Sequence, residues 1–534
     1  MSSRFKLTKT AKVLIFILIL AVIGGGVFAG VKTGFIKTSK DVTSDNEESN
    51  IADIFSESED SSETVADDGS VINTDKTDEA TINLSLDEWI GWKSIIDANG
   101  GLSTKDGSIY DKLGIKVNIS VINDATQSSN ALISGKLDAA GYTINRTAFL
   151  STKFKEAGVD VIMPFITNFS NGGDGIIAKR DIKTVADLVD VKVGVPQFSE
   201  AHTLVVWFVN QSDLSKDDKQ KIIDNLIFFE TPDEAAKAFF AGQIDVAATW
   251  EPYLTQAQNM SDAHILFSTA SSSSLVMDGI LFNKAFAEAN PEVVTKFIDG
   301  ALTASDLYDK DMTTIKSVMP MFSTASDQDI KDNCAGARLM TYADNLNMFS
   351  GTARTIYTSM SEVWKSIGES AETDLVDTLY DDKYITALAD KYDSADITKI
   401  ETVTVTDDNR TDVIDTIALL EKSTTINFVA NTAKFLDSAE ASSQMDEFIA
   451  IAKVLDGTII QIEGNIASDN DSEDGKMLSK QRAESVKKYF IMNGIDANRI
   501  IVIGNGGTKP VAPNTSEENM AQNRRTDIFF KIVE

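Results

Sequence analysis

The sequence predicts an α/β protein with a separate α+β region at its C-terminus, preceded by one N-terminal membrane helix and an acidic linker. Three observations support this architecture. Residues 81–392 alternate short apolar strands with amphipathic helices. A second, shorter alternation fills the chain from residue 424 to its end. Near the N-terminus, an uncharged apolar run precedes forty mostly acidic and small polar residues.

These shifts in composition predict six segments. They are a cytoplasmic N-terminus at 1–12, a transmembrane helix at 13–31, an acidic disordered linker at 32–80, an α/β region at 81–395, a second linker at 396–423, and the C-terminal domain at 424–534.

Residues 13–31 form a run of nineteen residues without a charge. At 1.5 Å per residue, a helix of this length spans roughly the 30 Å hydrocarbon layer of a bilayer. Four basic residues precede it, so the N-terminus is expected in the cytoplasm, with the bulk of a single-pass membrane protein outside. The alternative is a cleaved signal peptide, with Val27-Phe28-Ala29 as its cleavage site.

The linker prediction rests on charge. Residues 41–80 contain fourteen Asp or Glu, one Lys and one aromatic residue, Phe55. Such a segment buries too little apolar surface to offset the entropy of ordering it.

Composition also excludes several functions. The net charge of −32 argues against nucleic-acid binding, which needs clustered Lys and Arg. The single cysteine, Cys334, rules out an internal disulfide, and two histidines make a histidine metal site improbable. No Ser-His-Asp order, phosphate-binding Gly loop or catalytic pair of carboxylates is evident, so we expect no enzyme, cofactor or catalytic residue.

Within the α/β region, strands are predicted at 82–86, 115–121, 175–178, 191–195 and 244–249, and helical stretches at 130–134, 201–211 and 233–240. Alternation of this kind predicts open parallel sheets covered on both faces. Such sheets bind ligands at the carboxyl ends of their strands.

Several motifs of this region occur in a characteristic order. The motifs are ALISGKLDAA at 131–140, GGDGIIAK at 172–179, VADL at 185–188, KVGVP at 192–196, AFFAGQIDVA at 238–247 and TWEPY at 249–253. The ordered set resembles the nitrate/sulfonate/taurine class of ABC-transporter substrate-binding proteins, over about 300 residues. The resemblance implies a periplasmic-binding-protein fold of two α/β lobes that close on a small ligand about a hinge, and an ABC permease as a partner.

Nine residues are expected to bind that ligand because they follow predicted strands or open helices. They are Trp89, Gly91, Trp92, Tyr142, Thr143, Ser199, His202, Trp250 and Glu251. A helix starting after Ser199 would present free N–H groups to an anion. Each residue has a structural alternative: a tryptophan that packs a lobe, an ordinary helix cap, or a hydrogen-bonded histidine.

The aromatic residues of this group, with Glu251, also suit a cation, since aromatic faces attract ammonium groups. Opposite an anion-binding helix end, they would suit a zwitterion such as an amino sulfonate.

In the C-terminal region, strands are predicted at 424–428, 458–463, 499–503 and 526–532, and helices at 442–455 and 478–493. The order LSKQRA at 478–483, then NRR at 523–525, resembles the OmpA-like peptidoglycan-binding domain. In that family an Asp and the Arg of this motif bind diaminopimelate. Arg482 matches the Arg, whose planar fork can pair both oxygens of a carboxylate.

The family's Asp position holds Ala467 here, with Asp469 two residues further on. The resemblance implies peptidoglycan binding by Arg482, Asp469, Asn523 and Arg524. Alternatively, the acidic run at 469–474 is a solvated loop and the C-terminal arginines hold the last strand to the sheet.

The sequence thus favours a membrane-tethered extracytoplasmic receptor for a sulfonate-, taurine- or nitrate-like ligand, docked to peptidoglycan. An envelope scaffold or ligand sensor, without transport, is the alternative.

Overall fold

The computed structural model describes residues 37–38, 63–65, 71–73, 81–398, 404–406, 409–469 and 472–532. The predicted membrane segment at 13–31 lies outside these residues, as does most of the acidic linker. Within the described part, no helix combines the length and apolar character needed to cross a membrane.

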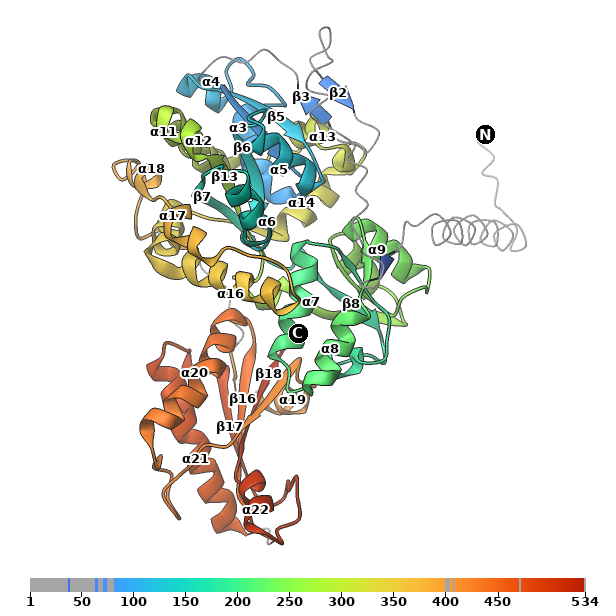
Figure 1. Ribbon diagram of the computed structural model, residues 1–534, viewed down its shortest axis with the longest axis vertical. Coiled ribbons are helices and arrows are strands. Elements are labelled where there is room, and N and C mark those ends of the chain that lie inside the picture. The colour runs from blue at the N-terminus through green and yellow to red at the C-terminus, as the bar shows by residue number, and fades with distance from the viewer. Residues whose placement is uncertain are drawn as a thin grey trace, which may run out of the picture.

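Three sheets organise the described chain into two lobes and a C-terminal domain (Figure 1). The sheet of the first lobe has the order β14-β7-β13-β6-β4-β5-β3-β2, and that of the second lobe β1-β10-β9-β11-β8-β12. The C-terminal sheet has the order β15-β18-β16-β17.

The strand bounds are as follows. In the first lobe they are β2 Glu63–Val65, β3 Val71–Asn73, β4 Thr81–Leu86, β5 Lys116–Val121, β6 Ala139–Thr143, β7 Val161–Ser170, β13 Met277–Asn283 and β14 Ala337–Leu339. In the second lobe they are β1 Lys37–Thr38, β8 Asp174–Lys179, β9 Val193–Pro196, β10 Ile227–Phe229, β11 Val246–Trp250 and β12 Ala263–Ser268. In the C-terminal domain they are β15 Leu420–Thr424, β16 Ile459–Asn465, β17 Ile500–Gly506 and β18 Thr526–Lys531.

The helices fill the connections. Those between residues 93 and 304 are α3 Lys93–Asn99, α4 Ile109–Leu113, α5 Ala125–Ile133, α6 Ile144–Glu156, α7 Glu200–Gln211, α8 Lys216–Asp224, α9 Pro232–Phe240, α10 Tyr253–Gln258, α11 Lys284–Ala289 and α12 Pro291–Ala304. Those that follow are α13 Thr313–Val318, α14 Asp327–Ala335, α15 Tyr342–Asn347, α16 Ala353–Ser366, α17 Val376–Leu379, α18 Lys383–Thr386, α19 Arg410–Asp415, α20 Ser438–Val454, α21 Glu473–Met492 and α22 Glu517–Asn523.

Both lobe sheets are mixed, which corrects the prediction of parallel sheets. β4 runs parallel to β5 and β6, and β9 parallel to β10 and β11, as helical crossovers require. β13 runs antiparallel to β6 and β7, and β8 antiparallel to β11 and β12. The four strands that flank the passages between the lobes, β7, β8, β12 and β13, all pair antiparallel to their neighbours.

Within residues 81–398, the chain passes from the first lobe to the second between β7 and β8 and returns between β12 and β13. Thr269, on the return segment, ties the two passages together. Its Oγ1 lies 2.8 Å from Ser170 Oγ, accepts from Gly172 N at 2.9 Å and donates to the Asp174 carbonyl at 3.1 Å. These two passages connect the lobes, and we refer to them as the hinge. Helix α16 packs against α6 of the first lobe and α7 of the second.

Part of the predicted acidic linker belongs to the first lobe. β2 and β3 pair as a hairpin, and Val71 of β3 lies opposite Val121 of β5. Ile72 is fully buried, and Asn73 Nδ2 donates to the Leu102 carbonyl at 3.1 Å. The Val-Ile-Asn run supplies the β-branched apolar surface that the surrounding acidic sequence lacks.

The predicted linker at 396–423 is likewise partly folded, and the predicted strand at 424–428 is misplaced, because β15 covers Leu420–Thr424 and shares only Thr424 with it. β15 pairs with β18 along its whole length. Val413 of α19 covers Ile459 and Ile501 on the sheet face opposite α20 and α21. Lys531 Nζ donates to the Ile414 carbonyl at the end of α19 at 2.7 Å. The sequence of α19 and β15 does not show a clear apolar pattern, because charged residues alternate with the few apolar residues that are buried.

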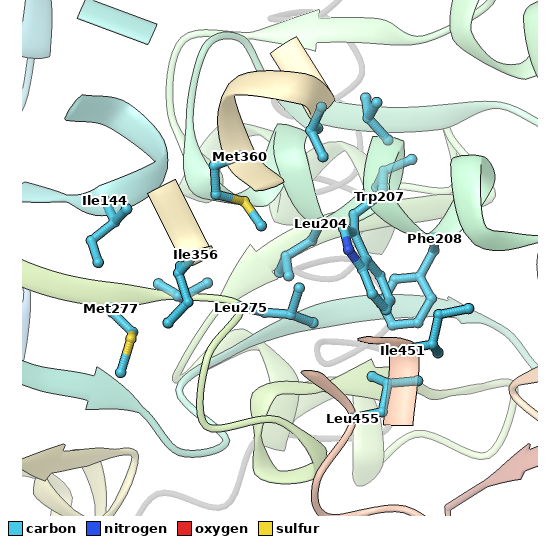
Figure 2. Packing of buried hydrophobic residues seen from close by; sticks show 14 of the residues in the cluster. Ile144, Leu204, Trp207, Phe208, Leu275, Met277, Ile356, Met360, Ile451 and Leu455 are labelled. Atoms are coloured by element: carbon cyan, nitrogen blue, oxygen red, sulfur yellow. The ribbon is translucent and has the colours of Figure 1, made fainter. Parts of the chain in front are cut away.

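The C-terminal domain packs on the second lobe through a shared apolar core (Figure 2). Trp207 and Phe208 of α7 lie beside Ile451 of α20 and Leu455 after it. The turn between α20 and β16 reaches the hinge, where Gly457 N donates to the Ser271 carbonyl at 3.1 Å.

Candidate functional site

The two lobes meet at charged side chains placed by strand ends. Asp87 follows β4, Arg146 lies in the first turn of α6, and Glu200 opens α7 of the second lobe. Arg146 Nη2 donates to Glu200 Oε2 at 3.1 Å, and Nη1 lies 3.6 Å from Asp87 Oδ2. Asn145 Nδ2 also donates to Thr203 Oγ1 at 2.7 Å. Polar contacts therefore join the two lobes.

Two further buried carboxyl groups interact with this cluster. Burial, ahead of repulsion from Glu200, raises the pKa of Asp174 from 3.8 to about 7. Burial, followed by the charges of Asp87 and Asp174, raises the pKa of Asp278 well above its usual range. Burial also raises the pKa of Asp87, against the attraction of Arg146. The cluster thus contains four carboxyl groups and one guanidinium.

Four polar atoms of this region are buried without a hydrogen-bond partner among the described residues: Asp278 Oδ2, Arg146 Nε, Asn145 Oδ1 and Trp250 Nε1. Trp250 lies opposite Asp174 in the pairing of β11 with β8. Asp278 lies opposite Thr143 of β6. Each lobe therefore contributes one carboxyl group and unpartnered polar atoms.

The tryptophans after β4 are held by hydrogen bonds. Trp89 Nε1 donates to Asn168 Oδ1 at 3.0 Å, and Trp92 Nε1 donates to Asp87 Oδ1 at 2.6 Å. Trp92 is fully buried and orients Asp87. A Cβ at Gly91 would lie 2.4 Å from both Trp89 Nε1 and Asn168 Oδ1, so this glycine allows their close packing.

Tyr142, Thr143 and Ser199 occupy the predicted positions at strand ends and helix starts. The Tyr142 hydroxyl shares a 2.6 Å hydrogen bond with Ser128 Oγ. Thr143 Oγ1 accepts from Arg146 N at 3.0 Å as the N-cap of α6. Ser199 caps α7 and donates to the Pro196 carbonyl at 2.7 Å.

His202 lies in an aromatic environment rather than among the acids. Its ring makes edge contacts with Phe228 and Trp364, and Nδ1 accepts from Phe198 N at 3.4 Å. Burial lowers the pKa of His202 to about 3, so the ring is neutral near pH 7 and brings no positive charge to the cleft.

The predicted pair Trp250 and Glu251 separates into two roles. Trp250 remains beside Asp174 with its indole N–H unpartnered. The Glu251 carboxylate accepts from Thr255 N at 3.0 Å and from Thr255 Oγ1 at 2.9 Å, and so holds the first turn of α10.

Sequence reasoning named Trp89, Tyr142, Thr143 and Trp250 near the centre of this region but missed most of its charge. Arg146, Asp174 and Asp278 were not singled out. The available signal was positional, because Asp174 starts a strand after Gly-Gly and Arg146 follows Thr143 by three residues.

In the C-terminal domain, the predicted wall-binding residues share one neighbourhood. Asp469 Oδ1 accepts from Asn514 Nδ2 at 2.8 Å, and Asn523 Nδ2 donates to Asn514 Oδ1 at 2.8 Å. Arg524 pairs with Glu517. Asn523, which is buried, fixes the loop that carries Asn514.

Arg482 of α21 lies close enough to Arg524 for their charges to interact; burial, followed by that repulsion, lowers the pKa of Arg482. The Arg482 guanidinium stacks 4.9 Å from the centre of the Phe428 ring, and Nε donates to the Thr432 carbonyl at 3.1 Å. The Nε edge of the Arg482 guanidinium is therefore already hydrogen-bonded within the domain.

The described residues contain no cluster of three His, Cys, Asp or Glu suited to a metal ion. A cavity of about 580 Å³ lies elsewhere, in the first lobe, between α12, α14, β14 and residues 392–398. It is lined by that lobe alone, so closure about the hinge would not reshape it.

Comparisons with known proteins define the two parts of the chain. Residues 104–308 match the family described as NMT1/THI5 like, and residues 427–524 match the OmpA family. The chain therefore joins an NMT1/THI5-like region to a C-terminal OmpA domain.

Several curated relatives are outer-membrane proteins or lipoproteins. Outer membrane protein A of Bordetella avium is 37% identical over 89 residues, which are 17% of this chain and 46% of that protein. The probable lipoprotein YiaD of Escherichia coli is 39% identical over 71 residues, 13% of this chain and 32% of that protein. A peptidoglycan-associated lipoprotein of Buchnera aphidicola is 26% identical over 117 residues, 22% of this chain and 66% of that protein. The chain thus covers less than two thirds of each relative's length.

Similar solved structures include two sulfonate-binding proteins. The periplasmic aliphatic sulphonate binding protein SsuA of Escherichia coli has a TM-score of 0.45 at 16% identity, covering 57% of this chain and 98% of its own. The alkanesulfonate-binding SsuA of Xanthomonas axonopodis has a TM-score of 0.43 at 17% identity, with the same coverage.

Proposed function

We propose that this protein is an extracytoplasmic solute-binding protein of the ABC-import type, docked to peptidoglycan by its OmpA domain and tethered to the cell membrane by residues 13–31. It binds a small molecule between the lobes, delivers it to a permease, and catalyses no reaction. The observation that carries the proposal is the interface between the lobes, which meet at buried and partly unpartnered polar groups. Such groups occur mainly where a ligand or an ordered water completes them.

The resemblance to the nitrate/sulfonate/taurine class made a sulfonate, taurine or nitrate the first expectation. The nine predicted ligand residues remain a proposal, with Trp89, Tyr142, Thr143 and Trp250 best placed. Of the others, Gly91, Trp92, Ser199, His202 and Glu251 support the cleft through packing or helix starts.

Lobe closure tests solute binding. The purified full chain, mixed with a small-molecule extract of bacterial cells, is expected to become more compact by small-angle X-ray scattering. Native mass spectrometry of the same sample is expected to show a retained small molecule. A scattering curve that stays unchanged with every extract would contradict the proposal.

Sedimentation with isolated sacculi tests the wall attachment. We expect the full chain to co-sediment, and Arg482→Ala to weaken co-sedimentation about tenfold or more, because a charge-assisted hydrogen bond is lost. Lys488→Ala, an exposed change on the same helix, is the matched control. Equal sedimentation of all three proteins would remove Arg482 from the wall site.

The alternative is an envelope sensor that reports ligand binding at the wall. The contact of the C-terminal domain with the hinge favours it, since Asp456 Oδ1 accepts from Ser273 N at 3.0 Å on the return passage. A ligand that changes the affinity of the chain for sacculi would support the sensor, whereas a constant affinity would favour transport.

A further inference from the structure

The interface between the lobes holds more acidic groups than basic ones: Asp87, Asp174, Glu200 and Asp278 against Arg146. Among the described residues of this cluster, Arg146 is the only cation, and it already forms ion pairs with Glu200 and Asp87. Asp87 additionally accepts from Trp92. Within the described chain, neither Asp174 nor Asp278 has an ion-pair partner. Two carboxyl groups therefore lack a direct ion pair, although the charge of Arg146 reaches Asp174.

Asp278 provides a second and independent observation. Its side chain is buried at 2% exposure, yet Oδ2 has no hydrogen-bond donor. An acceptor in this state costs about 1–3 kcal/mol, so such groups occur mainly where a ligand or water completes them. A donor entering from the cleft would satisfy it.

The surroundings of the two acids suit a cation. Trp250 is paired across the sheet with Asp174, and Trp89 donates to Asn168, which lies opposite Asp278 in the pairing of β13 with β7. Each acid thus has an aromatic residue close to it in the fold. Carboxylates beside indole rings are a common environment for protonated nitrogen.

The same geometry disfavours an anion. The N-terminus of α7 was the expected anion site, but Glu200 in its first turn already places a carboxylate there, bound to Arg146. The neutral ring of His202 adds no positive charge. A sulfonate at this position would meet four carboxyl groups and one committed guanidinium.

We propose that the cleft binds a ligand through a cationic nitrogen, an ammonium or amidinium group, held by Asp174 and Asp278. The inference rests on the proposed solute-binding function and specifies its ligand class. The positive charge supplies the missing counter-charge, and the N–H donors satisfy Asp278 Oδ2. Because a bound cation favours the ionised form of Asp174 and Asp278, binding would release protons from these two acids. The charges of Asp87, Arg146 and Glu200 also act on their protonation.

Fractionated extract provides the test. Small molecules from bacterial cells are separated by ion exchange into cationic, anionic and neutral fractions, and each is added to the full chain. The readouts are tryptophan fluorescence, lobe closure by scattering, and the mass of the retained compound. We expect the cationic fraction to act, with tighter binding at about pH 8 than at about pH 6.

Variants assign the effect to residues. Asp278→Asn and Asp174→Asn should each weaken binding of the cationic fraction about tenfold or more, since a charge-assisted contact is lost. Both replacements resemble the protonated acid, so the fold should persist, as a thermal melt would verify. Asp190→Asn, an exposed carboxylate on the second lobe, should bind as the wild type does.

Three outcomes overturn the inference. If the anionic or neutral fraction alone closes the lobes, the ligand class is wrong while the solute-binding function stands. If the cationic fraction binds both Asn variants as tightly as it binds the wild type, the two acids are not the binding groups. If no fraction acts at all, the proposed function falls with the inference.

Discussion

Asp174 shows how burial at the cleft couples protonation to stability. Its pKa is raised from 3.8 to about 7, first by burial and then by Glu200. An acid whose pKa is higher in the folded state holds its proton more tightly there. The resulting stability is complete below the unfolded pKa and is lost as the pH rises through about 7.

We therefore predict that Asp174→Asn makes the free energy of unfolding less dependent on pH. Between about pH 5 and about pH 8, the wild type should lose roughly 2–3 kcal/mol more than the variant, because the amide cannot ionise. Urea unfolding of the ligand-free full chain at both pH values measures the difference. Asp190→Asn should follow the wild type, and parallel curves for Asp174→Asn would contradict the assigned pKa.

The residues of the cleft also show what sequence reasoning can reach. Strand ends are predictable from hydrophobic periodicity, so the sequence places Trp89, Tyr142 and Trp250 at or just after the ends of strands, as the structure does. Their partners are not predictable in this way, because the bond from Trp89 to Asn168 spans 79 positions. The anion site after Ser199 was expected from helix geometry alone. The orientation of the Glu200 side chain is set by its contact with Arg146, which cannot be predicted from a single sequence.

Among the elements, the strongly periodic ones were predicted and the short, charged ones were missed. The predicted strands at 82–86 and 458–463 correspond to β4 and β16. β15, with the sequence LEKST, was assigned to a linker. Its Lys422 is buried along its stem, ion-paired with Glu447 and 5.9 Å from the Phe448 ring centre. A charged residue can thus occupy a buried strand position when its end reaches a partner.

Helix α19 yields a prediction at this scale. Val413 is fully buried against Ile459 and Ile501, so Val413→Ala removes two buried methyl groups and should destabilise the C-terminal domain by about 2 kcal/mol. Hydrogen exchange at the amides of β16 and β17 in the full chain measures it. Val429→Ala, at a half-exposed loop position, should have little effect. Equal protection in both variants would show that the segment does not cover the sheet.

For the whole molecule, the decisive contact joins the C-terminal domain to the hinge. Residues 183 positions apart meet where Ser273 donates to Asp456, and Ser423 N donates to Asp213 Oδ2 at 2.6 Å on the other side of the apolar contact. These contacts depend on the surfaces of two separate domains, so the sequence pattern of either domain alone does not predict them. Any rotation of the second lobe must carry the C-terminal domain along or break these bonds.

Gly457 is the position that tests this docking. A Cβ there would lie 2.8 Å from Ser271 Cα and 3.0 Å from the Ala270 carbonyl oxygen, both backbone atoms that cannot move aside cheaply. Gly457→Val should therefore separate the C-terminal domain from the hinge, so that one calorimetric transition becomes two and the radius of gyration rises. Met492→Ala, at a highly exposed position of the same domain, should retain the wild-type profile. If Gly457→Val unfolds in a single transition at an unchanged radius, the domains do not dock through this turn, and ligand closure and wall attachment are independent.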